Sequence, residues 1–226
     1  MDATSPLIDW SRYKTVVFDV DGTLYDQRRL RLAMAVRLTV EFLKTGDTRL
    51  LRTIRTFRSC RETHEFIGAN LESDQYEVPA RILKLDPDYV RSVIEDWMEK
   101  RPLVTLGKCL YPHVDRVFAS LRRSSKTICI FSDYPVRAKL EALGLHADLM
   151  VCATDPEIGR LKPDPKGLLH VLKTTNTRPQ ECLMIGDRAD RDGLAARRAG
   201  VDVILRSKPV DGYVTFMSFD DPIFDE

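Results

Sequence analysis

The sequence predicts an α/β protein, with a Rossmann-like parallel sheet covered by helices on both faces and an inserted all-helical cap domain. After residue 126, short apolar runs of strand length alternate with helical segments, which is typical of parallel sheets. These runs are apolar at nearly every position, as expected for strands that are buried on both faces. Residues 27–110 show helical spacing of apolar residues and no convincing strand.

The predicted strands are short. The first covers residues 15–19, where Val16, Val17 and Phe18 favour a buried strand because they are β-branched or aromatic. The remaining strands are predicted at residues 127–131, 149–152, 182–185 and 201–205, with a short edge strand at 213–216.

The helices are predicted from apolar residues at helical spacing and from glycines that follow several of the segments. In the first helix of the insert, Leu32, Val36, Val40 and Leu43 recur at this spacing. Helices are predicted at residues 30–44, 48–59, 61–71, 76–84 and 87–99 in the insert, and at 136–143, 165–173 and up to 199 in the core.

These segments predict two domains. Residues 1–26 and 111–226 would form the α/β core, and residues 27–110 would form the helical cap. Ligands of open parallel sheets bind beyond the carboxyl ends of the strands. Because the insert begins just after the first strand, it could act as a lid over a ligand bound there.

The charge balance argues against nucleic acid or an anionic membrane surface as a partner. The chain has 35 Lys and Arg against 34 Asp and Glu, a formal net charge of +1. Residues 28–61 are locally rich in arginine. We interpret this stretch as a solvated helix face, with attraction of an anionic substrate as the alternative.

The cysteines predict a reducing compartment. Their number is odd, no pair has C-x-x-C spacing, and several lie in apolar runs, so free buried thiols are expected. They are Cys60, Cys109, Cys129, Cys152 and Cys182. No apolar run reaches membrane-spanning length and the N-terminus lacks a signal-peptide core, so we expect a soluble, cytoplasmic protein.

Two carboxylates at the end of the first strand indicate chemistry. Asp19 and Asp21 are two residues apart, so their side chains face the same way on an extended chain. Neighbouring carboxylates repel unless a cation or a proton offsets their charge. Gly22 lets the backbone turn and approach a ligand closely. An ordinary turn is the alternative, whereas residues 24–29 do not continue the ligand pattern of an EF-hand calcium loop.

Other polar residues follow the later strands or lie in the loops between them. They are Ser132 and Asp133 after the second strand, Lys162 between Gly159 and Pro165, and Asp187, Asp190 and Asp192 after the fourth strand. Each alone has an ordinary explanation as a helix cap, a turn residue or a solvated lysine. Because the carboxyl ends of parallel strands share one edge, their combination predicts one site.

Together these segments resemble the haloacid dehalogenase superfamily, most closely its phosphatases with a helical cap after the first motif. The matching segments are Asp19-Val20-Asp21-Gly22-Thr23-Leu24, Phe131-Ser132-Asp133, Lys162-Pro163-Asp164-Pro165 and Gly186-Asp187 through Asp192. The cap is assigned by its position and helical pattern, without a motif of its own.

The resemblance implies a role for each motif residue. Asp19 would be the nucleophile that forms an aspartyl-phosphate, and Asp21 would protonate the leaving alkoxide and then activate water. Mg²⁺ would be held by Asp19, the backbone carbonyl of Asp21 and Asp187, which are hard oxygen donors. Lys162 would offset the negative charge at the reaction centre.

The resemblance also implies a phosphate-binding set. Its members are the Ser132 hydroxyl, Lys162 and backbone N–H groups around Val20, Asp21 and Asp133. A further carboxylate would support the site from behind, through contact with Lys162. The sequence leaves Asp192 and Asp190 as alternatives for that role.

The sequence therefore predicts a Mg²⁺-dependent phosphomonoester hydrolase for a small phosphorylated metabolite. A phosphomutase on the same scaffold and a non-catalytic phosphate-binding module are the alternatives. Asp21 favours phosphate esters over carbon–halogen bonds, because the dehalogenases of the superfamily lack an acid at this position. Arg28, Arg31 and His64 of the cap could contact a substrate, although surface exposure is the usual explanation for such residues.

Overall fold

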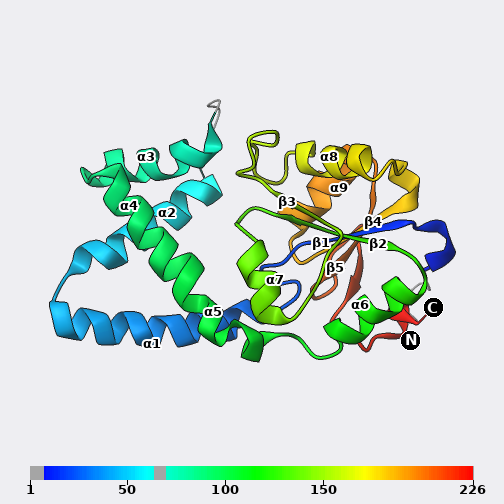
Figure 1. Ribbon diagram of the computed structural model, residues 1–226, viewed down its shortest axis with the longest axis horizontal. Coiled ribbons are helices and arrows are strands. Elements are labelled where there is room, and N and C mark those ends of the chain that lie inside the picture. The colour runs from blue at the N-terminus through cyan, green and yellow to red at the C-terminus, as the bar shows by residue number, and fades with distance from the viewer. Residues whose placement is uncertain (1–7, 64–69, 226) are drawn as a thin grey trace.

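The computed structural model describes residues 8–63 and 70–225, and it shows an α/β half beside an all-helical half (Figure 1). The helical half contains α1 (Gln27–Thr45), α2 (Thr48–Thr63), α3 (Leu71–Leu83), α4 (Pro87–Ile94) and α5 (Arg101–Leu106). The α/β half contains α6 (Val114–Arg123), α7 (Arg137–Leu143), α8 (Lys166–Thr174) and α9 (Leu194–Ala199). Short 3₁₀ turns lie at Trp10–Arg12, Gly107–Cys109, Pro179–Glu181 and Pro222–Phe224, and π-helical turns at Glu95–Lys100 and Ala189–Gly193.

One parallel sheet organises the α/β half. Its strands are β1 (Thr15–Phe18), β2 (Thr127–Ser132), β3 (Leu149–Cys152), β4 (Cys182–Gly186), β5 (Asp202–Arg206) and β6 (Val214–Phe216). The spatial order is β3-β2-β1-β4-β5-β6, and each neighbouring pair is parallel. The predicted parallel α/β sheet is thus confirmed, and the last strand lies at an edge as expected.

Helices cover both faces of this sheet (Figure 1). Val16 and Phe18 of β1 belong to an apolar cluster that includes residues of α6 and α7. Val17, between them, belongs to a second cluster with residues of α8 and α9 on the opposite face. Successive side chains of a strand point to opposite faces, so a strand covered on both sides must be apolar throughout.

The helical half has a core of its own. Phe57 of α2, Tyr76 of α3 and Ile94 of α4 pack in an apolar cluster that is separate from the two clusters of the sheet. Phe57 and Tyr76 stack with their ring centroids 5.8 Å apart. The chain enters and leaves this half at neighbouring points, because Tyr25 and Leu110 form an antiparallel bridge.

The apolar face of α1 differs from the one that its sequence suggests. Leu32, Val36 and Leu43 recur at helical spacing, yet they are exposed, with Leu43 at 76 %. The helix instead buries Leu30 and Met34. Apolar spacing predicted the helix correctly, but it did not predict which side packs against the protein, because that depends on tertiary contacts.

Several predicted helix bounds are wrong. One helix, α2, continues past residue 59 to Thr63, where a break was predicted at residue 60; residues 64–69 of the predicted helix 61–71 lie outside the described residues. The predicted helix 76–84 starts earlier, at Leu71, because Asn70 caps it. The helix predicted to end at residue 99 instead continues through a π-helical turn into α5, whose first turn holds Pro102. Proline is accepted in a first turn.

The helix α6 is not among the predicted helices, although it packs against the sheet. It buries Val114, Val117, Phe118 and Leu121, and the ring centroid of Phe118 lies 4.7 Å from that of Phe18. His113 precedes it with a left-handed backbone (φ 68°) and without a side-chain cap, so the usual start signal is absent.

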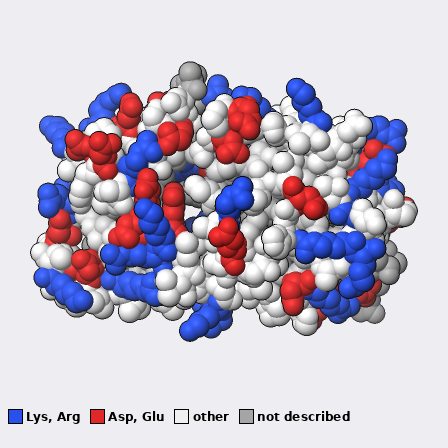
Figure 2. Space-filling view, viewed as in Figure 1, with Lys and Arg blue, Asp and Glu red and all other residues white. Residues whose placement is uncertain are grey.

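The predicted free thiols are confirmed, since all five cysteines are unpaired and buried. Acidic and basic side chains are interspersed over the face seen in Figure 2, in keeping with the balanced composition. Among residues 8–63 and 70–225, no helix combines the length and apolar character needed to cross a membrane.

Candidate active site

The motif residues converge because three adjacent strands end at one edge of the sheet. Asp19 directly follows β1, Ser132 is the last residue of β2, and Asp187 directly follows β4. Since β1 lies between β2 and β4 in a parallel sheet, the three positions lie side by side. This is the edge at which open α/β sheets bind ligands.

Lys162 links two of the carboxylates at this edge. Its Nζ lies 2.6 Å from Oδ1 of Asp19 and 2.6 Å from Oδ1 of Asp192. All three residues are buried, at 2 %, 5 % and 1 % exposure respectively. Of the two candidates for the supporting acid, Asp192 therefore contacts Lys162, whereas Asp190 pairs with Arg188 at the surface.

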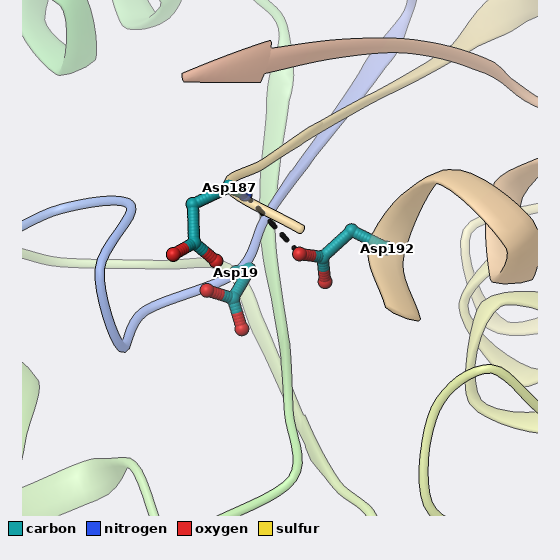
Figure 3. A group of neighbouring side chains, drawn as sticks. All are labelled: Asp19, Asp187 and Asp192. Carbon is teal, nitrogen blue, oxygen red and sulfur yellow. Dashed lines mark hydrogen bonds between the residues drawn. The ribbon is translucent and has the colours of Figure 1, made fainter. Parts of the chain in front are cut away.

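Asp19, Asp187 and Asp192 form an acidic cluster whose nearest carboxylate oxygens all lie within 4.8 Å of one another (Figure 3). Asp192 already uses both oxygens: one accepts from Lys162, and the other accepts from the backbone N–H groups of Asp187 and Arg188. In the described part of the chain, no hydrogen bond reaches the carboxylate of Asp187. This carboxylate is therefore available to a cation together with Asp19.

Gly22 is required by the close approach of Asp187. Its backbone has φ 100°, a conformation that L side chains rarely adopt. A Cβ atom at this position would lie 2.3 Å from Oδ2 of Asp187. The loop after β1 thus passes directly beneath the carboxylate that follows β4.

The electrostatics of the cluster also favour a bound cation. Burial raises the pKa of Asp19 well above its usual range, and the carboxylates of Asp192 and Asp187 add to this effect although Lys162 opposes it. Burial, together with Asp192, raises the pKa of Asp187 to about 7. Two carboxylates with raised pKa values and hard oxygen donors fit a divalent metal ion such as Mg²⁺, which would relieve their repulsion.

Lys162 is held in its charged form by this cluster. Burial by itself would lower the pKa of Lys162, but the adjacent carboxylates of Asp19 and Asp192 raise it well above its usual range. The site therefore keeps a permanent positive charge beside Asp19. Thr23 also donates a hydrogen bond to Oδ2 of Asp19, at 2.8 Å, and this fixes the orientation of the carboxylate.

Asp21 has partners that sequence analysis did not identify. Lys139 of α7 lies 2.7 Å from both of its carboxylate oxygens, and the Tyr25 hydroxyl donates to Oδ1. Burial raises the pKa of Asp21, but Lys139 outweighs it and the net shift is downward. A helix was predicted at residues 136–143, just after Ser132, and Lys139 lies within it. The short distance along the chain between this helix and Ser132 was the signal that could have identified Lys139.

The expected phosphate-binding residues are close together but differ in access to solvent. Ser132 and Val20 are fully buried, and the Ser132 hydroxyl accepts a hydrogen bond from the backbone of Tyr134. Asp133 accepts from the backbone N–H of Lys162 at 2.9 Å and lines the adjacent cavity.

A cavity of about 410 Å³ lies above the acidic cluster, between the two halves of the protein. Its floor includes Asp19 and Asp187 from the core, and its opposite wall includes Arg31 of α1 and Arg58 of α2. Arg28 is exposed and does not line this cavity.

A residue of α2 also ties the helical half to the active-site loop. The Glu62 carboxylate accepts from Arg188 at 2.8 Å and from Arg191 at 3.2 Å. These two arginines come from the segment that carries Asp187 and Asp192. His64, a further candidate from the sequence, lies outside the described residues.

Comparison with known proteins supports this arrangement. A phosphoglycolate phosphatase of Rhodospirillum rubrum is 34 % identical over 92 % of this chain and 87 % of its own length. A glyceraldehyde 3-phosphate phosphatase of Methanopyrus kandleri is 26 % identical over 83 % of this chain and 81 % of its own length. The crystal structure of a HAD phosphatase from Thermococcus onnurineus superposes with a TM-score of 0.64 at 20 % identity, covering 91 % of this chain and 94 % of that one.

The family comparison covers most of the chain. Residues 13–200 match the family model described as haloacid dehalogenase-like hydrolase. This span includes the acidic cluster, Lys162 and the whole helical insert. The chain therefore belongs to the haloacid dehalogenase-like hydrolases, as its motifs predicted, and it is a phosphatase of that family.

Proposed function

We propose that the protein is a Mg²⁺-dependent phosphomonoester hydrolase that acts on a small phosphorylated metabolite through an aspartyl-phosphate on Asp19. The observation that carries this proposal is the position of Asp19, between the Lys162 ammonium and the free carboxylate of Asp187, at the floor of a cavity. A phosphoryl group above Asp19 would be flanked by positive charge on one side and by a metal site on the other.

The proposed metal ligands are Asp19, Asp187 and the backbone carbonyl of Asp21. These residues fit a metal ion because burial and neighbouring carboxylates raise the pKa values of Asp19 and Asp187. A bound cation would offset the negative charge that raises them. When bound, Mg²⁺ would neutralise phosphate oxygens and lower the repulsion that opposes attack by a carboxylate. Asp192 would support the site from behind in this proposal, because one of its oxygens accepts from Lys162 and the other accepts from the backbone N–H groups of Asp187 and Arg188.

In the first step, an oxygen of Asp19 attacks phosphorus and the alkoxide leaves. Thr23 and Lys162 each hold one oxygen of this carboxylate, so the nucleophile is oriented before the substrate binds. Lys162 also stabilises negative charge that develops on the phosphoryl oxygens. The Ser132 hydroxyl and the backbone N–H groups around Val20 and Asp133 are proposed as further donors.

Asp21 is proposed to move the protons. It would give one to the leaving alkoxide, then take one from the water that hydrolyses the aspartyl-phosphate. In the free site Lys139 keeps this carboxyl ionised. A phosphate dianion beside Asp21 raises the pKa of its carboxyl, because like charge disfavours the ionised form. Substrate binding would thus favour the protonation state that the first step needs.

We propose that residues 27–110 act as a cap domain over a core formed by residues 1–26 and 111–226. The apolar cluster within the helical half supports a separate unit, and the Tyr25–Leu110 bridge supports boundaries close to these positions. The cap would close the cavity and exclude water during phosphoryl transfer. The exposed contacts of Glu62 with Arg188 and Arg191 would break and re-form as it opens and closes.

The decisive experiment measures phosphate release from a panel of small phosphate esters, with Mg²⁺ and with a chelator. We expect release that requires the metal and is abolished in Asp19→Asn, whereas the matched surface variant Asp190→Asn remains active. Rapid acid quenching with a radiolabelled ester should leave label on the protein, in a bond that hydroxylamine cleaves.

Two results would contradict the proposal. One is that no ester in the panel releases phosphate, because a phosphomonoester hydrolase must release it from at least one of them. The other is an isomeric phosphate ester as the main product, detected by phosphorus NMR, which would indicate a phosphomutase.

A further inference from the structure

Two arginines on the cap wall of the cavity have no anionic partner. Arg31 of α1 and Arg58 of α2 both line the cavity. Within residues 8–63 and 70–225, neither guanidinium donates a hydrogen bond or forms an ion pair. Both residues are exposed, so water solvates their donors when the cavity is empty, and a ligand with acceptor atoms could take the place of that water.

The other cations of the cavity wall contrast with this pair. All of them donate to acceptors of the protein: Arg61, Lys139, Lys162, Arg188 and Arg191. Among the described residues, Arg31 and Arg58 are therefore the cations of the cavity wall that have no acceptor from the protein. Donors left open inside a cavity are available to a ligand.

The two guanidinium groups also repel each other. Burial lowers the pKa of Arg58, and the charge of Arg31 lowers it further. An anion between the two groups would reverse both effects, because it supplies opposite charge and acceptor atoms. The like charge of the pair therefore favours a bound anion.

The position of the pair identifies which part of a substrate would meet it. Arg31 and Arg58 both lie within electrostatic reach of Tyr25. The Tyr25 hydroxyl in turn donates to Asp21, the proposed proton donor to the leaving oxygen. The pair is therefore near the Tyr25–Asp21 side of the cavity, where the proposed mechanism places the leaving alcohol.

Glu99 also lines the cavity without a hydrogen bond or an ion pair among the described residues, and it does not neutralise the pair. Burial raises the pKa of Glu99, and the strongest charges that act on it are those of Glu95, Lys139 and Arg61. Neither Arg31 nor Arg58 is among them. An anion at the arginine pair would therefore meet a net positive environment.

We propose that Arg31 and Arg58 together bind a carboxylate on the alcohol portion of the substrate, so that the enzyme prefers phosphorylated hydroxy acids over neutral polyol or aldehyde phosphates. This inference rests on the proposed phosphatase function and narrows it to one substrate class. Guanidinium groups match the planar geometry of a carboxylate. A cavity of about 410 Å³ that also holds the phosphoryl group suits a leaving group of a few carbon atoms.

The test compares 3-phosphoglycerate with glycerol 3-phosphate, which differ only in a carboxylate that replaces a hydroxymethyl group. Charge-assisted hydrogen bonds predict that kcat/KM for the carboxylate substrate is higher by about 10- to 100-fold. Phosphoserine tests whether an added ammonium group is tolerated, and p-nitrophenyl phosphate reports activity without any recognition of a carboxylate.

Variants of Arg31 and Arg58 test whether these two residues cause the preference for the carboxylate substrate. Arg31→Gln and Arg58→Gln should each reduce the ratio of the two kcat/KM values, mainly through KM, and the double variant should bring the ratio close to one. Arg28→Gln on α1 and Arg52→Gln on α2 are matched controls, because both residues are exposed arginines of the same two helices but do not line the cavity. The two control variants should leave the ratio and the turnover of p-nitrophenyl phosphate unchanged.

The outcomes separate this inference from the proposed function. Turnover of p-nitrophenyl phosphate with equal kcat/KM for the two matched substrates would overturn the carboxylate site and leave the phosphatase intact. A preference for 3-phosphoglycerate that survives the double variant would also overturn it. No turnover of any ester would overturn the proposed function itself.

Discussion

The buried charges on the floor of the cavity are paired with one another, whereas two arginines on its cap wall have no partner among the described residues. On the floor, Lys162 is almost fully buried and contacts both Asp19 and Asp192. On the cap wall, Arg31 and Arg58 remain open to the cavity and have no acceptor among the described residues. In the proposed mechanism, the groups that perform chemistry are positioned before the substrate arrives, whereas the two arginines proposed to recognise it gain a protein-bound acceptor only when it binds.

The largest effect is expected on the floor, from Asp19→Asn. The amide cannot act as the nucleophile, so kcat should fall by at least about 10⁴-fold. Steady-state assays with saturating Mg²⁺ measure this loss. Asp190→Asn is the control, because its carboxylate is exposed and pairs with Arg188 at the surface. Activity of Asp19→Asn close to that of the parent would show that another group attacks phosphorus.

Lys162→Met tests whether the buried ion pairs of Lys162 with Asp19 and Asp192 stabilise the fold. The variant leaves Asp19 and Asp192 buried without their cation, so we expect a loss of about 3–5 kcal/mol in the free energy of unfolding. Urea denaturation measures it. The double variant Lys162→Met with Asp192→Asn should recover part of the stability, because one buried charge is removed. An unchanged unfolding midpoint in the single variant would contradict this account.

The metal site should respond to pH through Asp187, whose pKa is raised to about 7. Mg²⁺ needs the ionised carboxylate, so its affinity should fall by up to about tenfold for each pH unit below this value. Titration calorimetry of Mg²⁺ measures the change. An affinity that is equal at about pH 8 and about pH 6 would argue against Asp187 as a ligand.

The same raised pKa has a consequence for stability without metal. A group whose pKa is raised by folding stabilises the fold below its ordinary pKa, and this stabilisation is lost as pH rises through about 7 for Asp187. Added Mg²⁺ should therefore raise Tm more in alkaline than in acidic buffer. Thermal unfolding of the Asp187→Asn variant, which has no such charge, provides the control.

The smallest effect is expected from Glu62→Gln, which breaks the contacts between the cap and the active-site loop. Its side chain is 52 % exposed, so the loss of unfolding free energy should be about 1 kcal/mol or less. The loss should shrink further at high salt, because exposed charges are screened. A loss as large as that of Lys162→Met would show that the cap is held by buried charges as well.

The sequence predicted the sheet and the strand-end residues well, because both depend on local patterns. Continuous apolar runs indicate strands buried on two faces, and Asp19, Ser132 and Asp187 were brought together by parallel topology alone. Fold class and family are confirmed. The catalytic roles of these residues stay predictions until they are measured.

Residues that reach the site from helices were harder to predict. Lys139 and Arg58 reach the site because of the rotation and packing of α7 and α2, and no local pattern specifies these. The same limit explains the exposed side of α1, where the apolar spacing of Leu32, Val36 and Leu43 does not correspond to the buried face. Helical spacing predicts that a helix forms, and tertiary contacts decide which way it faces.

The bridge between Tyr25 and Leu110 has an evolutionary consequence. Because the chain departs from the sheet and returns to it at adjacent residues, an insertion of different length or sequence can be accommodated there while the strand order stays the same. Exchange of this one segment could then remodel the wall of the cavity among descendants, while Asp19 and Asp187 keep their places at the ends of adjacent strands.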